Sequence, residues 1–278
     1  MSAPRACVIG HPVAYSRSPA IHKYWLAEHG IAGDYVREDV APVNIMAFLA
    51  GFADSGYVGA NVTVPHKEAA FAAAEADAVS RELGAVNTLW LEGRRLLGTN
   101  TDVHGFLANL DEQQPGWDLR TRLAVVLGAG GAARAILHGL LERGVEEITL
   151  VNRTPARAQA LAAHFGPHVR PVGFGELSAA LASADLLVNA TSLGMQGAPP
   201  LDINLGPSKP GAMVYDIVYV PFETGLLKAA RARGHPAVDG LGMLLHQAAP
   251  AFERFFGVRP RVTPALRRHV LADMGGGG

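Results

Sequence analysis

The sequence of 278 residues predicts an α/β fold in two domains. Short apolar runs alternate with amphipathic segments along most of the chain, which is typical of a largely parallel sheet covered by helices on both faces. A polar stretch at residues 111–118 interrupts the alternation, which then starts again. The length and the hydrophobic content of 49% suffice for two separate cores.

The first hundred residues contain the first series. Ser18-Pro19 predicts a helix start, with serine as the N-cap and proline at the first helical position. Pro65 ends a strand because proline has no N–H to donate, and Glu92-Gly93-Arg94 is typical of a hairpin turn. We expect strands at residues 6–10, 35–39, 59–64, 87–91 and 95–98, and helices at 18–29, 43–53, 66–74 and 77–83.

The second series follows a helix that begins at Asp102 or Val103. We expect its strands at residues 123–127, 147–151, 185–189 and 213–217, with helices between them. Two further helices are expected at residues 241–256 and 263–272. The periodicity alone does not assign these last helices to either domain.

A glycine-rich turn joins the first strand of this series to its helix. The pattern is G-x-G-x-x-A, in which Gly128 permits the tight turn, Gly130 leaves room for a pyrophosphate and Ala133 allows close helix–strand packing. The helix N-terminus offers free N–H groups to phosphates. The segment therefore predicts a Rossmann-like domain that binds a dinucleotide. The alternative is a tight turn in a domain that binds no ligand.

The end of the next strand indicates which dinucleotide is bound. NAD sites usually place Asp or Glu there to accept from the ribose 2′-OH, whereas this chain has Asn152-Arg153-Thr154, followed by Arg157. A guanidinium can hold the 2′-phosphate that a carboxylate would repel. We therefore expect NADP(H), with a solvated surface charge as the alternative for each arginine.

Charge and cysteine content exclude several classes of protein. The formal net charge of -1 gives no basic surface for nucleic acid, and no apolar run is long enough to span a membrane. Cys7 is the only cysteine, so no disulfide can form within the chain, and no signal peptide is visible. We expect a cytoplasmic protein. The histidines are scattered without zinc-type spacing, so we expect no metal.

Polar side chains gather at predicted strand ends in the first domain, where α/β sheets place ligands. Short hydroxyl and amide side chains around one lysine and one aspartate suit a small polyhydroxylated ligand. Each could instead serve as a turn, a helix cap or a strand end. The clusters are Ser16-Arg17-Ser18, the segment Asn61 to Lys67, and Gly84 to Thr88 together with Asn100-Thr101-Asp102.

Lys67 and Asp102 could form an acid–base pair, in which the amine protonates an oxygen and the carboxylate holds the amine. His66 is a rival because histidine exchanges protons readily near neutral pH, and spacing alone does not choose between His66 and Lys67. The simpler alternatives are a solvated charge for Lys67 and a helix N-cap for Asp102.

The motifs of this chain, and the order in which they follow one another, resemble those of the shikimate dehydrogenase family over nearly the whole chain. The resemblance implies an oxidoreductase of the shikimate pathway, in aromatic amino-acid biosynthesis, that reversibly reduces 3-dehydroshikimate to shikimate with NADPH. The motifs are Ser16-x-Ser18-Pro19, Asn61-Val62-Thr63-Val64-Pro65-His66-Lys67, Gly84-Ala85-Val86-Asn87-Thr88, Asn100-Thr101-Asp102, Gly128-Ala129-Gly130-Gly131-Ala132, Asn152-Arg153-Thr154, Asn189-Ala190-Thr191-Ser192, Asp216 to Tyr219, and Asp239 to Gln247.

The resemblance also implies the roles of residues and domains. The substrate domain would comprise residues 1–102 and 240–278, because the C-terminal helices return to it, and the NADP domain residues 103–239. Lys67 would be the acid–base residue, with Asp102 beside it. Substrate would be bound by Ser16, Ser18, Asn61, Thr63, Lys67, Asn87, Asp102, Tyr219 and Gln247. The cofactor would be bound by Gly128, Ala129, Gly130, Gly131, Ala132, Asn152, Arg153, Thr154, Arg157, Thr191, Val218, Gly240 and Met243.

Two alternatives to this function stay open. A quinate or dual quinate/shikimate dehydrogenase is the nearer one, and Ser18 and Arg153-Thr154 disfavour it. A non-catalytic NADP-binding sensor on the same scaffold is the other, and the presence of Lys67 and Asp102 disfavours it. We expect the protein to be a monomer or a homodimer.

Overall fold

The computed structural model describes residues 3–275, which form two compact α/β units. One unit contains the chain up to Gly105 together with the residues from Leu244 onward, and the other contains Phe106–Met243. Helix α11 (Pro264–Gly275) and most of α10 (Gly240–Phe256) therefore belong to the first unit. The predicted α/β fold in two domains is confirmed. Among residues 3–275, no helix is long and apolar enough to cross a membrane.

The first unit is built on a six-stranded sheet in the order β2-β1-β3-β5-β6-β4. Strands β1, β2 and β3 are parallel, and β5 runs antiparallel to both β3 and β6. The strands are β1 (Arg5–Gly10), β2 (Asp34–Asp39), β3 (Gly59–Val62), β4 (Glu75–Ala76), β5 (Thr88–Glu92) and β6 (Arg95–Thr99). The helices are α1 (Ser18–Glu28), α2 (Ile45–Ala50), α3 (Lys67–Ala73), α4 (Ala78–Leu83) and α11 (Pro264–Gly275), with parts of α5 (Asp102–Gln113) and α10 (Gly240–Phe256).

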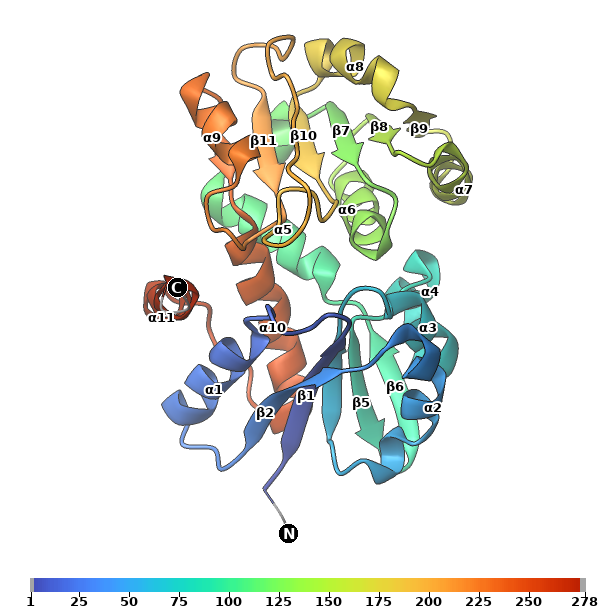
Figure 1. Ribbon diagram of the computed structural model, residues 1–278, viewed down its shortest axis with the longest axis vertical. Helices are drawn as coiled ribbons and strands as arrows, with labels where there is room; N and C mark the ends of the chain where they lie inside the picture. The colour runs from blue at the N-terminus through green and yellow to red at the C-terminus, as the bar shows by residue number, and fades with distance from the viewer. Residues whose placement is uncertain (1–2, 276–278) are drawn as a thin grey trace. The chain divides into compact units, whose positions relative to one another are not determined.

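Strand β1 shows how the alternation of the sequence builds two cores. Cys7 and Ile9 point into a core shared with α2 and α3, whereas Ala6 and Val8 point into a core shared with Phe255 of α10. These helices flank the two faces of the sheet (Figure 1). Because β1 is buried on both faces, it is a continuous apolar run.

The second unit contains a fully parallel six-stranded sheet in the order β9-β8-β7-β10-β11-β12. Numbered within the unit, this is the 3-2-1-4-5-6 order of Rossmann dinucleotide-binding folds, whose order reverses between β7 and β10. The strands are β7 (Leu123–Leu127), β8 (Glu147–Val151), β9 (Val169–Val172), β10 (Leu186–Asn189), β11 (Met213–Asp216) and β12 (Ala237–Val238). The helices are α6 (Gly131–Glu142), α7 (Pro155–Phe165), α8 (Leu177–Ser183) and α9 (Gly225–Ala232).

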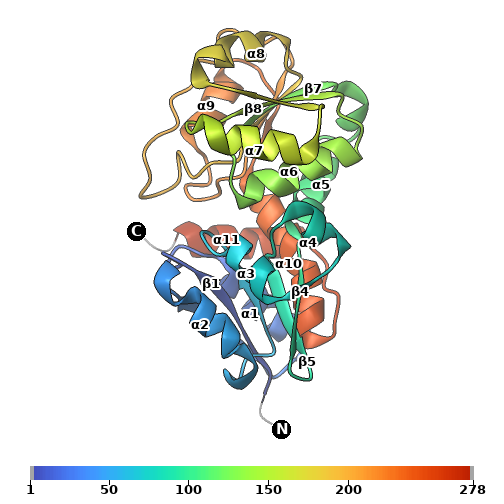
Figure 2. The ribbon, with the colours of Figure 1, turned by 90° about the vertical axis from the view of Figure 1, so that its right-hand side faces the viewer.

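Helices cover both faces of this sheet. Val125 and Leu127 of β7 share one core with Leu181 of α8 and Leu226 of α9. Helices α6 and α7 lie side by side over the sheet (Figure 2). Gly139 of α6 faces Leu107 of α5, so close that an added Cβ would lie 3.3 Å from the leucine side chain.

Some local predictions were wrong. The helix expected at 43–53 is divided into short helical turns at Pro42–Asn44 and Phe52–Asp54 around α2, which ends at Ala50. Ser18 is not an N-cap: it is the first residue of α1, and Arg17 occupies the cap position without a side-chain hydrogen bond. Strands β4, β9 and β12 were missed because two to four residues carry little periodicity.

Candidate active site

Several of the predicted substrate residues of the first unit lie at the ends of its strands, along one edge of its sheet. The loop after β1 carries Ser16, and the loop after β3 leads to Lys67. Asn87 precedes β5, and Asp102 follows β6 at the start of α5. Because β5 is antiparallel to β3 and β6, its amino end lies where those strands end. Sheet topology therefore gathers residues that are far apart in the sequence.

Lys67 and Asp102 form an ion pair between the Lys67 ammonium and the Asp102 Oδ2 oxygen. The two side chains are only 12% and 8% exposed. A charge pair this buried exchanges little with solvent, and each charge holds the other in place. The pair therefore places a protonated amine at a defined point beside a fixed carboxylate.

Asn87 links this pair to its surroundings. Its Nδ2 group donates to Asp102 Oδ1 at 2.8 Å and to Thr101 Oγ1 at 3.0 Å, while its Oδ1 atom accepts from the Thr101 backbone N–H at 2.8 Å. Gln247 of α10 lies within 3.4 Å of Asn87 and of Thr101 through its Oε1 atom. The amide of Asn87 is thus oriented by a carboxylate on one side and a backbone donor on the other.

Asn61 lies next to this network. Its register partner in β5 is Thr88, and its Nδ2 group donates to the Thr88 hydroxyl at 3.1 Å. Its Oδ1 atom accepts from the Tyr35 hydroxyl at 2.8 Å. Asn61 is buried, and neither end of its amide is without a partner. No sequence pattern indicated Tyr35, because its contact with Asn61 depends on the order of the strands.

The two predicted serines form a pair in the loop after β1. The Ser16 hydroxyl donates to Ser18 Oγ at 3.2 Å and accepts from the Ser18 backbone N–H at 3.3 Å. Arg37 of β2 fixes the loop, since its Nε and Nη2 groups donate to the Ser16 carbonyl at 3.0 and 2.6 Å. Two hydroxyls held side by side can both donate to one carboxylate.

The structure separates His66 from Lys67. The His66 ring is 1% exposed, and its Nε2 atom lies 2.6 Å from the Val40 carbonyl, for which it is a donor. The ring is therefore engaged in the core, on the side of α2 and β2. Lys67 reaches Asp102 instead. Only the lysine is thus available for proton transfer within this cluster.

Two further predicted substrate residues follow strands β3 and β11. Thr63 follows β3, where its backbone N–H donates to the Ile9 carbonyl at 2.8 Å. Tyr219 follows β11 and belongs to the second unit. Both roles stay predictions.

The glycine-rich turn has the geometry that a pyrophosphate needs. Gly128 has φ of +101°, a conformation that L side chains rarely adopt, and an added Cβ would lie 2.8 Å from Thr191. A Cβ added to Gly130 would meet no atom within 4 Å, so space is open there. Gly130 is the N-cap of α6 and supplies no side-chain hydrogen bond, which leaves the first N–H groups available. Ala129, Gly131 and Ala132 complete this turn, which fits a dinucleotide phosphate.

The end of β8 presents the predicted 2′-phosphate residues at the surface. Arg153, Thr154 and Arg157 are exposed, and Pro155 begins α7. Asn152 turns back into the loop, where its Nδ2 group donates to the Thr154 carbonyl at 2.9 Å. The exposed guanidinium of Arg153 lies one residue beyond the half-buried Asn152, so it has room to reach a phosphate.

A buried amide–carboxylate contact ties together the loops after β10 and β11. Asn189 Nδ2 donates to Asp216 Oδ1 at 2.8 Å, and Asn189 Oδ1 accepts from the Thr191 N–H at 3.0 Å. Asp216 also accepts from the Val218 N–H at 3.1 Å and the Thr224 hydroxyl at 2.7 Å. Burial raises the pKa of Asp216, although these hydrogen bonds act to lower it. The contact fixes Thr191 and Val218, two of the predicted cofactor residues.

Gly240 and Met243 lie at the start of α10. A Cβ added to Gly240 would lie 2.2 Å from the Ile217 carbonyl oxygen, so only glycine lets the helix approach the loop after β11. Met243 is buried. This close packing explains why residue 240 is a glycine. Its place near the nicotinamide stays a prediction.

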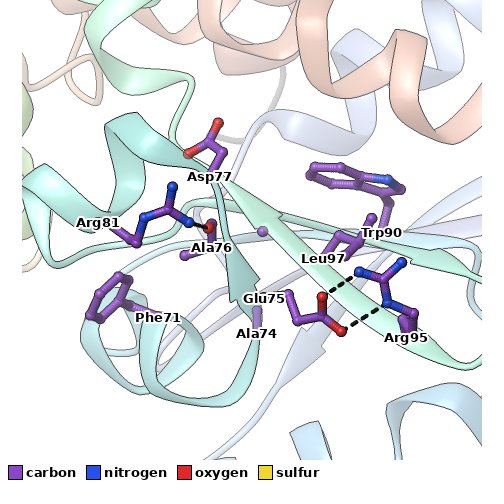
Figure 3. A pocket seen from close by; sticks show the side chains of 10 residues that line it. Phe71, Ala74, Glu75, Ala76, Asp77, Arg81, Trp90, Arg95 and Leu97 are labelled. Atoms are coloured by element: carbon purple, nitrogen blue, oxygen red, sulfur yellow. Dashed lines mark hydrogen bonds and ion pairs between the residues drawn. The ribbon is translucent and has the colours of Figure 1, made fainter.

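A hollow of about 660 Å³ in the first unit lies apart from these residues (Figure 3). It is lined by β4, β6 and Trp90, and contains none of the predicted site residues. Its arginines are engaged, because Arg95 pairs with Glu75 and Arg81 donates to the Ala76 carbonyl. We assign no part of the chemistry to it.

Three segments of the chain match known families. Residues 8–89 match the substrate binding domain of shikimate dehydrogenase, residues 109–195 match shikimate / quinate 5-dehydrogenase, and residues 240–268 match the C-terminal domain of shikimate 5'-dehydrogenase. The resemblance that the motifs indicated is confirmed.

Individual relatives match over almost the entire chain. A shikimate dehydrogenase (NADP(+)) of Azorhizobium caulinodans is 60% identical over 271 residues, covering 97% of this chain and 96% of the relative. Shikimate 5-dehydrogenase from Thermus thermophilus, solved with NADP(H) and shikimate, has a TM-score of 0.84 at 38% identity and covers 98% and 99% of the two chains. Quinate dehydrogenase from Corynebacterium glutamicum, solved with NAD, has a TM-score of 0.87 at 32% identity and covers 97% and 99%.

Proposed function

Because the chain belongs to the shikimate dehydrogenase family, we propose that it catalyses the reversible, NADP(H)-dependent reduction of 3-dehydroshikimate to shikimate. It is an oxidoreductase of the shikimate pathway. The observation that carries the assignment to chemistry is the buried ion pair of Lys67 and Asp102 beside a group of hydroxyl and amide side chains.

Lys67 acts as the acid in ketone reduction and as the base in the reverse direction. Its ammonium donates a proton to the ketone oxygen, where an alkoxide would otherwise develop at high cost. Asp102 holds the ammonium in position, and Asn87 holds Asp102. When bound, NADPH supplies the hydride that reduces the ring carbon.

The remaining polar residues bind the substrate. Ser16 and Ser18 hold its carboxylate with two hydroxyl donors. Asn61, Thr63, Asn87 and Gln247 hydrogen-bond the ring hydroxyls, and Tyr219 is a further proposed substrate-binding residue. These contacts determine affinity and orientation, whereas Lys67 determines the rate.

NADP is bound by the second unit. The open space at Gly130 and the free N–H groups of α6 receive the pyrophosphate, with Ala129, Gly131 and Ala132 around it. Arg153, supported by Asn152, Thr154 and Arg157, holds the 2′-phosphate. Thr191 and Val218 also bind the cofactor, and Gly240 and Met243 lie near the nicotinamide. Residues 103–239 would thus form the cofactor domain, and residues 1–102 with 240–278 the substrate domain.

A dual quinate/shikimate dehydrogenase is the second candidate function. The similarity to a quinate dehydrogenase solved with NAD favours it, and Arg153 at the end of β8 disfavours it, since NAD carries no 2′-phosphate. We further propose that the protein works in the cytoplasm as a monomer or a homodimer, and size-exclusion chromatography with light scattering tests the oligomeric state.

One experiment tests these functions together. Purified protein is mixed with shikimate or quinate and with NADP⁺ or NAD⁺, and the absorbance of the reduced nicotinamide is followed. Turnover with shikimate and NADP⁺ alone supports the proposal. Comparable turnover with quinate and NAD⁺ identifies the dual enzyme. No turnover with any pair, from folded protein that binds NADP⁺, identifies a sensor and contradicts the proposal.

A further inference from the structure

We infer that Tyr35 is a positioning residue for substrate recognition, because its hydroxyl sets the orientation of the Asn61 amide. The inference rests on the proposed function, in which Asn61 hydrogen-bonds the substrate. Tyr35 is in β2 and Asn61 in β3, with β1 between them in the sheet. The contact therefore passes across one strand, over the face that packs against α10.

A run of hydrogen bonds leads from Tyr35 to the acid–base pair. The Tyr35 hydroxyl donates to Asn61 Oδ1 at 2.8 Å, and Asn61 Nδ2 donates to the Thr88 hydroxyl at 3.1 Å. The Thr88 hydroxyl donates to Asn87 Oδ1 at 3.0 Å, and Asn87 Nδ2 donates to Asp102 Oδ1 at 2.8 Å. Every donor in the run points toward the carboxylate.

The direction of this run is determined at both of its ends. Asp102 is paired with Lys67 as a carboxylate and can only accept, so Asn87 must turn its Nδ2 group toward it. Asn87 Oδ1 is then an acceptor for Thr88, whose hydroxyl can in turn accept from Asn61 Nδ2. This leaves Asn61 Oδ1 facing Tyr35, which must donate.

Tyr35 is able to donate because its phenol stays protonated. Burial raises the pKa of Tyr35 well above its ordinary value, so the O–H group is present at neutral pH. The ring is held by packing, since it is fully buried and stacks on His22 at a centroid distance of 3.9 Å and an interplanar angle of 8°. Phenylalanine would keep this packing and remove only the hydroxyl.

Without the hydroxyl, Asn61 Oδ1 loses the donor that lies 2.8 Å from it. The amide can then turn over or point away, so it no longer meets the substrate in one orientation. We expect Tyr35→Phe to raise the KM for shikimate by about fivefold to thirtyfold, which is the effect of losing one buried hydrogen bond. The kcat and the KM for NADP⁺ should change by less than about threefold.

The experiment compares four proteins by steady-state kinetics: the unchanged chain, Tyr35→Phe, Asn61→Ala and the double variant. If Tyr35 acts through Asn61, Tyr35→Phe raises the KM for shikimate in the unchanged chain and has no effect in the Asn61→Ala background. An unchanged KM in Tyr35→Phe overturns the inference, as does an increase that persists in the Asn61→Ala background.

Tyr57→Phe is the matched control. Tyr57 lies in the same unit, is buried, and donates its hydroxyl to Glu38, away from Asn61. Its replacement removes an equivalent hydrogen bond and should leave the KM for shikimate unchanged. A similar rise in KM in Tyr57→Phe would show a general structural effect and overturn the inference.

Two measurements distinguish a failure of this inference from a failure of the proposed function. Turnover of the unchanged chain with shikimate is measured first, and its absence would contradict the proposed function itself. A neutron structure of the unchanged protein then needs no variant. A deuterium on Tyr35 Oη directed at Asn61 Oδ1 supports the inference, and a reversed amide, with Nδ2 toward Tyr35, overturns it.

Discussion

Removing the Lys67 ammonium should abolish most of the turnover while sparing substrate affinity. In Lys67→Met the side chain keeps its length and apolar stem, and only the proton donor is lost. Proton transfer by a positioned side chain contributes about a hundredfold to ten-thousandfold, which corresponds to about 3–5 kcal/mol of activation free energy. We expect kcat to fall by that factor, and the KM for shikimate to change by less than about tenfold.

The structure also predicts an effect of this substitution on stability. Asp102 is 8% exposed, and without Lys67 its charge is left with the hydrogen bond from Asn87 and little solvent. Breaking one side of a buried pair costs about 3–5 kcal/mol, and the Asn87 contact should keep the loss near the lower value. The double variant Lys67→Met/Asp102→Asn carries no unpaired charge, so it should regain stability without regaining turnover.

The assay follows reduced nicotinamide with shikimate and NADP⁺, alongside thermal unfolding of each variant. Lys23→Met is the control, because Lys23 belongs to the same unit and pairs with Asp34 at 3.0 Å on the surface. It should retain full turnover. A large rise in KM with near-normal kcat in Lys67→Met would refute the acid–base role and assign Lys67 to binding.

Three further predictions concern the cofactor, the first core and the second unit. Arg153→Ala should raise the KM for NADP⁺ by about tenfold to a hundredfold and leave the KM for NAD⁺ unchanged. An equal rise in the KM for both cofactors would contradict a contact with the 2′-phosphate. Burial lowers the pKa of His22 from 6.5 to about 3, so the unfolded state alone gains this proton as the pH falls. The free energy of unfolding should therefore fall below pH 6.5 by up to about 1.4 kcal/mol per pH unit, and urea titrations of His22→Phe should lack that slope. Although burial alone would raise it, hydrogen bonds from Lys209 and two backbone N–H groups hold the pKa of Asp185 below its ordinary value. Asp185→Asn should lower the free energy of unfolding by about 2 kcal/mol at neutral pH. The difference between the variant and the unchanged chain should vanish as the pH falls below 3.8 and through the lower pKa of the native state. Free energies of unfolding that run parallel in the two proteins across this pH range would contradict the prediction.

The strands with strong apolar runs followed from the sequence alone. Strand β1 and the central strands β7 and β8 are buried on both faces, and in an α/β chain a short apolar run bounded by turn residues is typical of such a strand. The turn at Gly128 was predicted for the same local reason, since its φ of +101° demands glycine. The class of ligand that binds at this turn was also predictable from the sequence, because the turn, the helix start and Arg153 are close together in the chain.

Contacts between distant residues depended on the tertiary structure. His66 and Lys67 are neighbours in sequence and were equivalent by type, yet one ring bonds to the Val40 carbonyl and the other side chain pairs with Asp102. The link between Tyr35 and Asn61 spans 26 residues and crosses β1. The order of strands in a sheet and their register are set by packing of the whole unit.

The fold class and the glycine-rich turn were thus predictable from the chain alone, because each is encoded within a few neighbouring residues, and the motifs supplied the candidate site residues. Which of those candidates touch one another depended on the folded structure. It paired Lys67 with Asp102, turned His66 into the core and placed Tyr35 behind Asn61. Hydrogen bonds and ion pairs depend on distances of a few ångströms between strands far apart in the chain, and no short segment of sequence encodes such distances.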